Sequence, residues 1–279
     1  LVKTECSDKR VTVLFHKQNK GIGAAVKNGY RFALTLNCDI LVKIDGDGQM
    51  NPATISKLIA PLVKGEADYT KGNRFHQPED LHSMPFKQLL ANAAHSFLSK
   101  VSTGYWQMFD PTNGLTAIHA RIVERLPLDK IADRYFFEND MLFRLNTLRA
   151  VVIDIPIQAF YGDEKGNLRI RNIAWEFIRK SLRNTWRRIA YNYFVRGFSI
   201  ASLELIIGLL LLTFGIIMGL CISLESDPSD APATAGTIML CALPTIIGAQ
   251  LFLSFLSYDM NTQPTRPLHP ALSDRASAE

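Results

Sequence analysis

Two long apolar runs near the carboxyl end constrain the fold of this chain more than any other feature. Residues 198–224 and 235–256 are almost wholly apolar, and each is at least as long as the roughly 20 residues that a helix needs to cross a bilayer. A short acidic link, residues 225–230, separates the two runs. The sequence therefore predicts a two-helix transmembrane hairpin over residues 198–260, followed by a tail over residues 261–279.

The distribution of positive charge predicts the orientation of this hairpin. The net charge is +5, the link contains no Lys or Arg, and Arg266 follows the second run. Because the cytoplasmic flanks of membrane helices are enriched in Lys and Arg, we expect the link outside and both ends of the chain in the cytoplasm. A basic cluster beside a membrane span suits anionic membrane lipids rather than nucleic acid. The cluster consists of Arg179, Lys180, Arg183, Arg187, Arg188 and Arg196.

An amphipathic stretch precedes the hairpin. Its large apolar residues recur at spacings of three and four, which predicts a helix with one apolar stripe. Tryptophans on the stripe and basic residues beside it are typical of a helix that lies in the membrane interface, here residues 173–197. The alternative is an amphipathic helix packed on a protein core. The stripe consists of Trp175, Ile178, Leu182, Trp186, Ile189 and Tyr193.

Residues 1–172 have the pattern of an α/β domain. Strand-like apolar segments alternate with helix-like ones, which predicts a largely parallel sheet flanked by helices, with ligands at the carboxyl ends of the strands. Residues 76–109 show no clean periodicity and are predicted only as helix or loop. The predicted strands are residues 11–16, 39–45, 68–74 and 151–157, and the predicted helices are residues 22–36 and 52–64.

Three oxygen-bearing side chains follow the second predicted strand. Asp45 and Asp47 are spaced i, i+2, and Gln49 comes two residues later. At the end of a strand these groups can converge on one hard divalent cation, which prefers oxygen ligands and bridges readily to phosphate. A calcium loop is excluded because Met50 and Ser56 stand where such a loop needs Gly and Glu. A plain surface turn remains the alternative, since Asp and Gly favour turns.

A glycine-containing segment, NKGIGAAV, joins the first predicted strand to a helix. Glycines at such a junction let the backbone approach a phosphate, and the amino end of a helix favours anions. A dinucleotide-binding fingerprint is disfavoured because its sixth position, here Val26, requires Gly or Ala. An ordinary helix start explains the segment equally well.

These motifs together resemble family 2 glycosyltransferases of the GT-A fold, and most closely the polyprenyl-phosphate sugar synthases. The resemblance rests on NKGIGAAVKNG, DILVKIDGDGQMNP, GNR, DPTNG and FEND, in that order along the chain. It implies an enzyme that transfers a sugar, with inversion, from a nucleotide-sugar to a polyprenyl (dolichyl or undecaprenyl) phosphate. It also implies that Asp45, Asp47 and Gln49 hold Mg²⁺ or Mn²⁺ against the donor diphosphate.

The resemblance assigns further roles residue by residue. Asn19, Lys20 and Gly23 match the donor-binding loop, together with Asp45. Glu138 and Asp140 stand where many relatives carry a catalytic base. The acceptor-binding candidates are Arg74, Asp110, Asn113, Gly114, Arg169 and Arg171, with Asn113 where the family commonly has Ser.

The need for a base depends on the acceptor, and two acceptors stay open. A hydroxyl group must lose its proton as it attacks, which would make Asp140 or Glu138 essential. A phosphate monoester is largely ionised at neutral pH and needs cations to position it instead. The alternative acceptor is a hydroxyl of a glycan or lipid in cell-envelope polysaccharide synthesis. The alternative to an enzyme is a catalytically silent membrane binding protein.

The start of the chain departs from the family pattern. The family normally begins with two further strands, the second ending in acidic residues that grip the nucleotide, and Leu1 follows that point. We expect a fragment of a longer protein rather than a sheet with damaged nucleotide binding. Assembly as a homo-oligomer is left open by the sequence.

Overall fold

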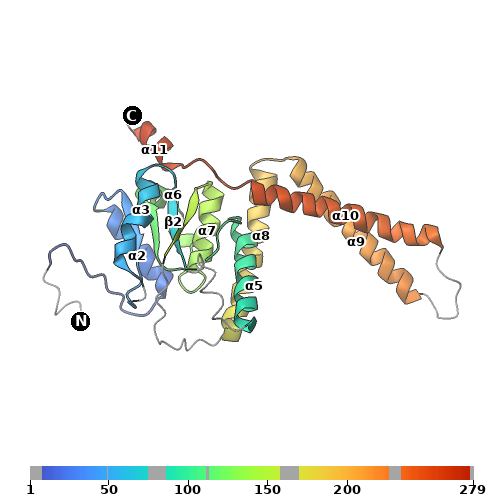
Figure 1. Cartoon of the computed structure of the whole chain (residues 1–279), viewed down its shortest axis with the longest axis horizontal. Coiled ribbons are helices and arrows are strands. Elements are labelled where there is room, and N and C mark those ends of the chain that lie inside the picture. Colours follow the sequence, from blue (N-terminus) through green and yellow to red (C-terminus); the bar gives the residue numbers. More distant parts are fainter. Residues whose placement is uncertain are drawn as a thin grey trace. The chain divides into compact units, whose positions relative to one another are not determined.

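The computed structural model describes residues 8–48, 50–74, 86–110, 113–157, 170–225 and 234–276 (Figure 1). The chain divides into two compact units. The first, called the domain below, comprises Leu1–Arg188 and Gln263–Glu279. The second, called the hairpin unit, comprises Ile189–Thr262. The segment predicted as a tail therefore packs mainly with the domain.

A four-stranded mixed sheet forms the centre of the domain. Its strands are β1 (Ile40–Lys43), β2 (Tyr69–Asn73), β3 (Thr116–His119) and β4 (Val152–Pro156), in the spatial order β1-β3-β2-β4. β3 pairs antiparallel with both β1 and β2, whereas β4 pairs parallel with β2. Three strands thus run in one direction and β3 runs against them. The predicted α/β class is confirmed, and the reversed strand β3 is an addition to it.

Helices flank both faces of this sheet. Asn51 caps η1 (Pro52–Thr54), the short helix that leads into α3 (Ile55–Val63). Its side chain accepts a hydrogen bond of 2.9 Å from the backbone N of Ala53, and the next residue is Pro52, a residue type common in the first turn of a helix. Arg149 ends α7 in the left-handed conformation, with φ 68°. The helices of the domain are α2 (Ile22–Leu34), η1 (Pro52–Thr54), α3 (Ile55–Val63), α5 (Phe86–Thr103), α6 (Ala120–Arg125), η2 (Leu128–Lys130), α7 (Phe137–Leu148), α8 (Ile170–Ala190) and α11 (His269–Ala276).

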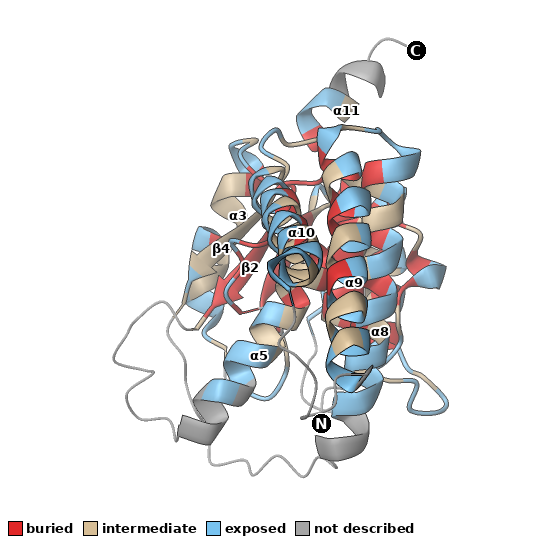
Figure 2. Cartoon of the chain, turned by 90° about the vertical axis from the view of Figure 1, so that its right-hand side faces the viewer, coloured by how far each residue is buried: buried red, intermediate tan, exposed pale blue. Residues whose placement is uncertain are grey.

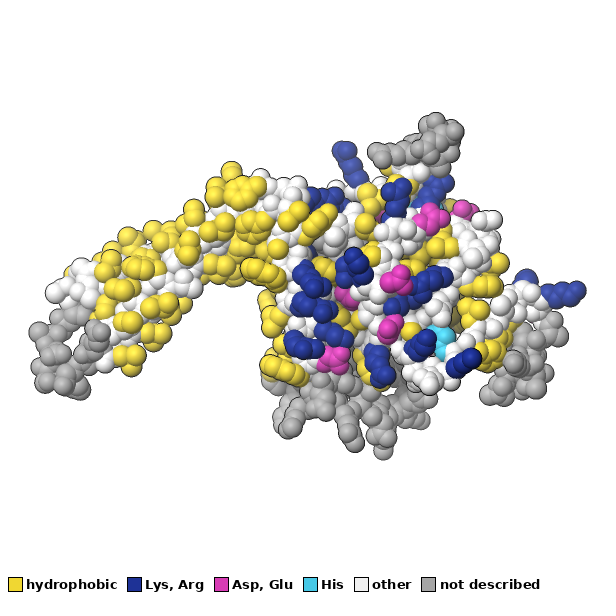
Figure 3. Space-filling model, turned by 180° about the vertical axis from the view of Figure 1, so that it is seen from behind, with side chains coloured by type: hydrophobic (Ala, Val, Ile, Leu, Met, Phe, Trp, Pro, Cys, Tyr) yellow, Lys and Arg dark blue, Asp and Glu magenta, His cyan; other side chains and the backbone are white. Residues whose placement is uncertain are grey.

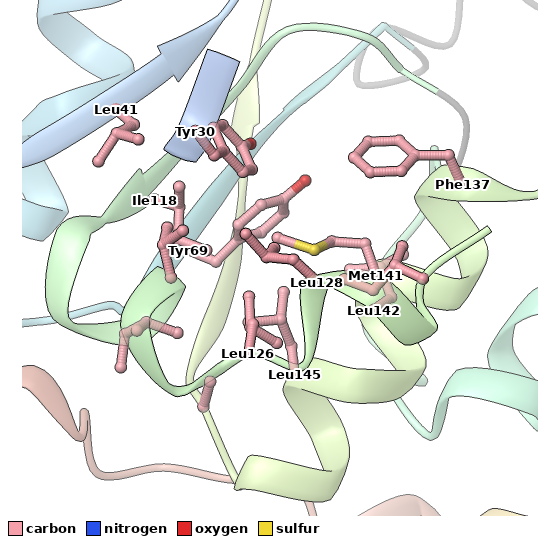
Figure 4. Close-up of a cluster of buried hydrophobic side chains, with 14 of the residues drawn as sticks. Tyr30, Leu41, Tyr69, Ile118, Leu126, Leu128, Phe137, Met141, Leu142 and Leu145 are labelled. Atoms are coloured by element: carbon pink, nitrogen blue, oxygen red, sulfur yellow. The ribbon is translucent and has the colours of Figure 1, made fainter. Parts of the chain in front are cut away.

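The larger part of the hydrophobic core lies on the sheet face covered by α2, α6 and α7. Leu41, Ile118 and Tyr69 come from three neighbouring strands and contact Tyr30 and the α7 side chains such as Met141 (Figure 4). The burial of each of these large side chains stabilises the fold by roughly 1.5–3 kcal/mol. On the opposite face, Leu58 and Leu62 of α3 pack on a smaller cluster.

The sheet face that carries the larger core becomes polar two residues further along the strands. Lys43 and Lys71 both pair in register with Thr116, one from each side. Lys71 pairs in turn with Asp154 on β4. Because paired residues on neighbouring strands point to the same face, these four side chains form one row across the sheet, called the polar row below. The sheet therefore changes from a dry core to a charged edge as β1, β2 and β4 approach their carboxyl ends.

The last part of the described chain binds to the start of two strands. The Asp68 carboxylate, fully buried just before β2, accepts hydrogen bonds from the backbone N atoms of Leu268 (2.8 Å) and His269 (2.9 Å). His269 Nδ1 lies 2.9 Å from the same carboxylate, and the backbone N of Val151, just before β4, donates to it at 2.8 Å. The His269 ring also stacks on His119, with 4.2 Å between the ring centroids. One buried acid thus fastens the segment after the hairpin to the domain.

The hairpin unit consists of the short helix η3 (Tyr191–Val195) and two long helices, α9 (Ile200–Glu225) and α10 (Ala235–Asn261). The two helices pack closely at glycines: a Cβ on Gly248 would lie 2.6 Å from the backbone N of Leu212. Small residues let helices in a membrane approach in this way.

Both helices are long and apolar enough to cross a membrane. The spans have mean hydropathies of 2.8 for Ile200–Leu224 and 2.0 for Ala235–Asn261, and most of their residues are exposed in this chain (Figure 2). Hydrophobic side chains cover the visible surface of the hairpin in Figure 3. Such exposure distinguishes these helices from the buried core helices of soluble proteins and fits the predicted hairpin.

One predicted strand is wrong. Residues 11–16, VTVLFH, form no strand, and Val11, Leu14 and Phe15 are 46%, 47% and 66% exposed. A strand is stable only when its backbone groups pair with a neighbour, and among the described residues β1 pairs with β3 alone. The apolar composition predicted a strand, but a strand forms only where a neighbouring strand is available for pairing.

Candidate active site

Asp45 lies two residues beyond β1, at the carboxyl end of the strand. Its carboxylate is held against Gly114, where an added Cβ would collide with Asp45 Oδ2 and lie 2.9 Å from Met50 Cε. Gly114 of the DPTNG motif thus approaches the acidic segment after β1. The structure brings together Asp45 and Gly114, which the sequence placed in the donor and acceptor sides of one site.

A buried lysine links Asp45 to α7. Lys43 Nζ lies 3.1 Å from Asp45 Oδ1 and 3.4 Å from Glu138 Oε1. The side chains of Lys43, Asp45 and Glu138 are 6%, 29% and 12% exposed. An ammonium group with so little access to water needs opposite charges around it, and these two carboxylates supply them. Glu138 of the FEND motif therefore belongs to the same charge cluster as Asp45.

The remaining members of the predicted metal set are described in part. Asp47 is exposed on the turn after Asp45, and Gly48 on this turn has φ 77°, a conformation that glycine adopts without strain. Gln49 lies outside the described residues. Among the described residues, no group of three His, Cys, Asp or Glu side chains forms a metal cage.

Two carboxylates are nevertheless a fitting donor set for Mg²⁺. This cation is usually held by one or two protein carboxylates, with substrate phosphates and water completing its shell. The partly exposed Asp45 and the exposed Asp47 meet that requirement, because both leave room for further ligands. The residues present thus fit a divalent cation that is bound together with a phosphate-bearing substrate.

Arg74 and Asp110 form a second charged unit. Arg74 Nε and NH2 lie 2.8 Å and 3.3 Å from the two oxygens of Asp110, in a bidentate arrangement. Asn113 Nδ2 donates to Asp110 Oδ2 at 3.3 Å, and Asn113 Oδ1 accepts from the backbone N of Leu115 at 2.9 Å. The Asp110 side chain is 1% exposed, whereas that of Arg74 is 32% exposed. Asp110 and Asn113 therefore hold Arg74, and Arg74 is the member that solvent or a ligand can reach.

The polar row lies beneath these groups. Lys71 is fully buried, and burial lowers its pKa to about 8 against the opposing effect of Glu138 and Asp110. Burial likewise raises the pKa of Asp154 to about 6, while a 2.8 Å hydrogen bond from the backbone N of Phe109 opposes the shift. Both groups are thus poised closer to neutral pH than ordinary lysines and aspartates.

The two candidate bases occupy different environments. Asp140 is 3% exposed, and its oxygens accept hydrogen bonds from the backbone N of Ala132 (2.9 Å) and from Asn184 Nδ2 (3.0 Å). These contacts fasten the preceding loop and α8 to α7. Glu138, in contrast, faces Lys43. The geometry gives Asp140 a structural task and leaves Glu138 as the candidate base nearer to Asp45.

The glycines of NKGIG pack on the loop before α7. A Cβ on Gly21 would lie 2.5 Å from Asp133 O, and one on Gly23 would collide with Ala132 O and lie 2.8 Å from the Phe137 ring. Asn19 Oδ1 accepts a hydrogen bond of 2.9 Å from the backbone N of Gly21, and Lys20 is exposed. Close packing therefore explains both glycines, and the donor-binding role of this loop stays a prediction.

Two predicted acceptor-binding arginines cannot be placed, and three charged residues near the site were not predicted. Arg169 and the side chain of Arg171 lie outside the described residues. The sequence did not predict Lys43, which joins Asp45 and Glu138 in the charge cluster, nor Lys71 and Asp154 of the polar row. The available signal was one charged residue in each of these strands, at the end of β1 and inside β2 and β4, which indicates polar partners on the same face of the sheet.

The helix α8 shows an inverted distribution of polar and apolar residues. Ser181 and Asn184 are fully buried against the domain, and Arg188 NH2 donates to Val101 O at 3.0 Å. Trp175 and Trp186, in contrast, are 70% and 74% exposed. The stripe is therefore exposed from Trp175 to Trp186, whereas Tyr193 at its end is 5% exposed and packs with Leu205 and Phe255. The core-packing alternative is wrong for the two tryptophans and holds for Tyr193.

Comparison with known proteins identifies the class of the domain. Residues 1–126 match the family model described as glycosyl transferase family 2. This match over residues 1–126 agrees with the resemblance drawn from the motifs.

Two relatives have names that describe sugar transfer to a lipid phosphate. The chain is 30% identical over 154 residues to UDP-N-acetylglucosamine–dolichyl-phosphate N-acetylglucosaminyltransferase of Methanococcus voltae, covering 55% of this chain and 61% of the relative. It is 28% identical over 151 residues to undecaprenyl-phosphate mannosyltransferase of Micrococcus luteus, covering 54% and 61%. The chain thus spans less than two thirds of the length of these relatives.

A solved structure is also similar in part. Glucosyl-3-phosphoglycerate synthase from Mycobacterium tuberculosis, in complex with Mn²⁺, UDP-glucose and phosphoglyceric acid, superposes with a TM-score of 0.41 at 18% identity. The match covers 64% of this chain and 56% of that one.

Proposed function

We propose that this protein is a membrane-anchored inverting glycosyltransferase that moves a sugar from a nucleotide-sugar to a polyprenyl phosphate. The observation that carries the proposal is the charge cluster of Asp45, Lys43 and Glu138 in a glycosyl transferase family 2 domain that precedes two membrane-length helices. The names of the relatives support a lipid phosphate as the acceptor.

Asp45 and Asp47 would hold Mg²⁺ or Mn²⁺, with Gln49 as the third predicted ligand. The cation supplies positive charge next to the diphosphate, whose negative charge grows as the leaving group departs. Gly114 keeps the space into which the Asp45 carboxylate fits, and Lys43 neutralises part of its charge. Asp45 is therefore held in one orientation before the donor binds.

The acceptor site would centre on Arg74. A phosphate monoester carries its own nucleophilic oxyanion at neutral pH and needs a fixed cation rather than a base. Asp110 and Asn113 orient the guanidinium of Arg74, and a planar guanidinium binds phosphate oxygens well. The structural task of Asp140 supports the phosphate acceptor over a hydroxyl acceptor that depends on Asp140 as base.

A membrane anchor would keep the domain at the bilayer that contains the lipid acceptor. The exposed tryptophans of α8, with arginines beside them, suit the interface of an anionic bilayer, and the hairpin would anchor the chain. Both ends of the chain would then lie in the cytoplasm, where nucleotide-sugars are available.

The test is transfer of labelled sugar from a panel of nucleotide-sugars to short polyprenyl phosphates, using the protein in detergent micelles. We expect metal-dependent transfer that Asp47→Asn reduces by about 100-fold or more, because the cation loses one of two carboxylates. Asp129→Asn is the matched control, since the Asp129 side chain is 94% exposed on the domain surface. Unchanged transfer by Asp47→Asn would remove the metal assignment.

A second variant separates the two acceptors. Glu138→Gln should leave transfer to a phosphate within about tenfold of the parent protein, whereas it should nearly abolish transfer to a hydroxyl, which needs the base. Transfer to a hydroxyl-bearing glycan or lipid, lost in Glu138→Gln, would replace the polyprenyl phosphate by the alternative acceptor.

A further inference from the structure

Lys43 occupies an unusual place for a lysine at a cation site. Its ammonium group lies between Asp45 and Glu138, within ion-pair distance of both, and its side chain is 6% exposed. β1 fixes its backbone through pairing with β3, where Lys43 lies opposite Thr116. The ammonium is thus a built-in positive charge next to the carboxylate that the metal would use.

We propose that Lys43 is a positioning residue that makes metal binding depend on the donor diphosphate. Without the donor, the ammonium neutralises Asp45 and repels a divalent cation, so the metal alone binds weakly. The inference rests on the proposed function, because it takes the metal site of that reaction as given.

The electrostatic argument concerns the balance of charges around Asp45. A divalent cation on Asp45 would lie a few ångströms from an ammonium group that Glu138 also holds in place. Like charges at that separation repel strongly where water is scarce, and Lys43 is nearly buried. A diphosphate adds negative charge on the open side of the cation and offsets this repulsion. The metal and the diphosphate should therefore bind together far better than the metal binds alone.

The ligand set agrees with this coupling. The described residues offer two carboxylates after β1 and no cage of three acidic, His or Cys side chains. A cation held by two carboxylates, one of them already paired with an ammonium, needs phosphate oxygens to complete its shell. Lys43 thus provides a physical reason for the metal to arrive with the substrate.

The experiment measures Mn²⁺ affinity directly, without turnover. Free Mn²⁺ is followed by electron paramagnetic resonance as it is titrated into the full chain in detergent, first alone and then with UDP. Lys43→Met should bind Mn²⁺ alone about tenfold or more tightly than the parent protein, because the repelling charge is gone. Lys43→Arg keeps the charge and should stay close to the parent. Lys57→Met on the exposed side of α3 is the matched control and should change nothing.

The outcomes separate this inference from the proposed function. In the parent protein, UDP should strengthen Mn²⁺ binding, and this strengthening should shrink in Lys43→Met. Unchanged or weaker binding of Mn²⁺ alone by Lys43→Met, in a parent that binds Mn²⁺ with UDP, overturns the role of Lys43 only. A parent that binds no Mn²⁺ even with UDP overturns the metal site itself. If circular dichroism shows that Lys43→Met is unfolded, Lys43→Gln carries the same expectation.

Discussion

At the scale of single residues, glycine at position 114 is required by a neighbour rather than by its own backbone. Gly114 is the point at which the DPTNG segment meets the Asp45 carboxylate. Any side chain there must displace that carboxylate or Met50. The Asp45 carboxylate can therefore take its position only because residue 114 has no Cβ. This requirement is visible in the folded chain and not in the sequence.

Gly114→Ala should reduce sugar transfer by about 100-fold, because a displacement of about 1 Å in a catalytic group has that effect. The rate is measured at saturating donor over a range of metal concentrations, where the variant should need more metal. Gly29→Ala is the control, since a Cβ on Gly29 meets no atom within 4 Å. Equal transfer by both variants would contradict the contact between Gly114 and Asp45.

Asp154 should make the stability of the domain depend on pH. Its pKa is about 6 in the folded protein and about 3.9 in an unfolded chain, so the folded state holds more protons between these values. Stability should therefore fall as the pH rises from about 4 to about 6. The charged groups that face Asp154 are Lys71, Asp110 and Lys100.

Asp154→Asn tests this expectation. The amide cannot ionise but still accepts the hydrogen bond from Phe109 N. The decrease in the free energy of unfolding between about pH 4 and pH 6 should therefore be smaller in the variant by about 1–3 kcal/mol. Urea unfolding of the protein at pH 4, 5, 6 and 7 measures it. A variant with the same pH dependence as the parent would assign the effect to other groups.

At the scale of elements, local pattern predicted those segments whose sequences carry their own signals. β1 and β4 are mostly apolar and β-branched, and Asn51-Pro52 marks the start of η1, which leads into α3, so these elements, and β2 as well, were predicted within a few residues. β3 was not predicted, because four residues, TAIH, carry little signal and its two partners are distant in the sequence. α7 was missed because it is buried on almost every side and therefore lacks an amphipathic stripe.

The candidate site was predictable to a similar extent. Motifs identified Asp45, Gly114 and Glu138 as members of one site, since chemistry determines those residue types. Lys43 and Lys71 could not be found in the same way, because a lysine near a strand end looks like an exposed edge residue. Only the register of β1, β3, β2 and β4 shows that the two lysines share a face with Asp154.

The segment after α10 should be released when Asp68 changes. Asp68→Asn replaces one acceptor oxygen by an NH₂ group that faces backbone N–H donors, and we expect a loss of about 2–4 kcal/mol in the free energy of unfolding. Limited proteolysis should then cut near residues 263–268 faster than in the parent. Asp129→Asn, an exposed change, should leave the cleavage rate as it is.

At the scale of the whole molecule, the hairpin determines which compartment the domain occupies. The basic residues of α8 and Arg266 flank the two spans, while the charged residues among residues 225–230 are all acidic. In sealed vesicles with the cytoplasmic face outward, added protease should digest the domain and leave the link intact until detergent is added. A protected domain in such vesicles would contradict the orientation.

The polar row has a consequence for how sequences of this type can vary. Residues on the α3 side of the sheet face an apolar cluster, where hydrophobic replacements of similar volume are tolerated. Lys43, Lys71 and Asp154 of this row interact electrostatically with one another and with Glu138 and Asp110, so a change at one alters what is acceptable at the others. Residues of the two apolar clusters should thus vary position by position, whereas residues of the polar row should accept substitutions mainly in compensating pairs. A deep mutational scan of double substitutions would record this difference as coupling concentrated in the polar row.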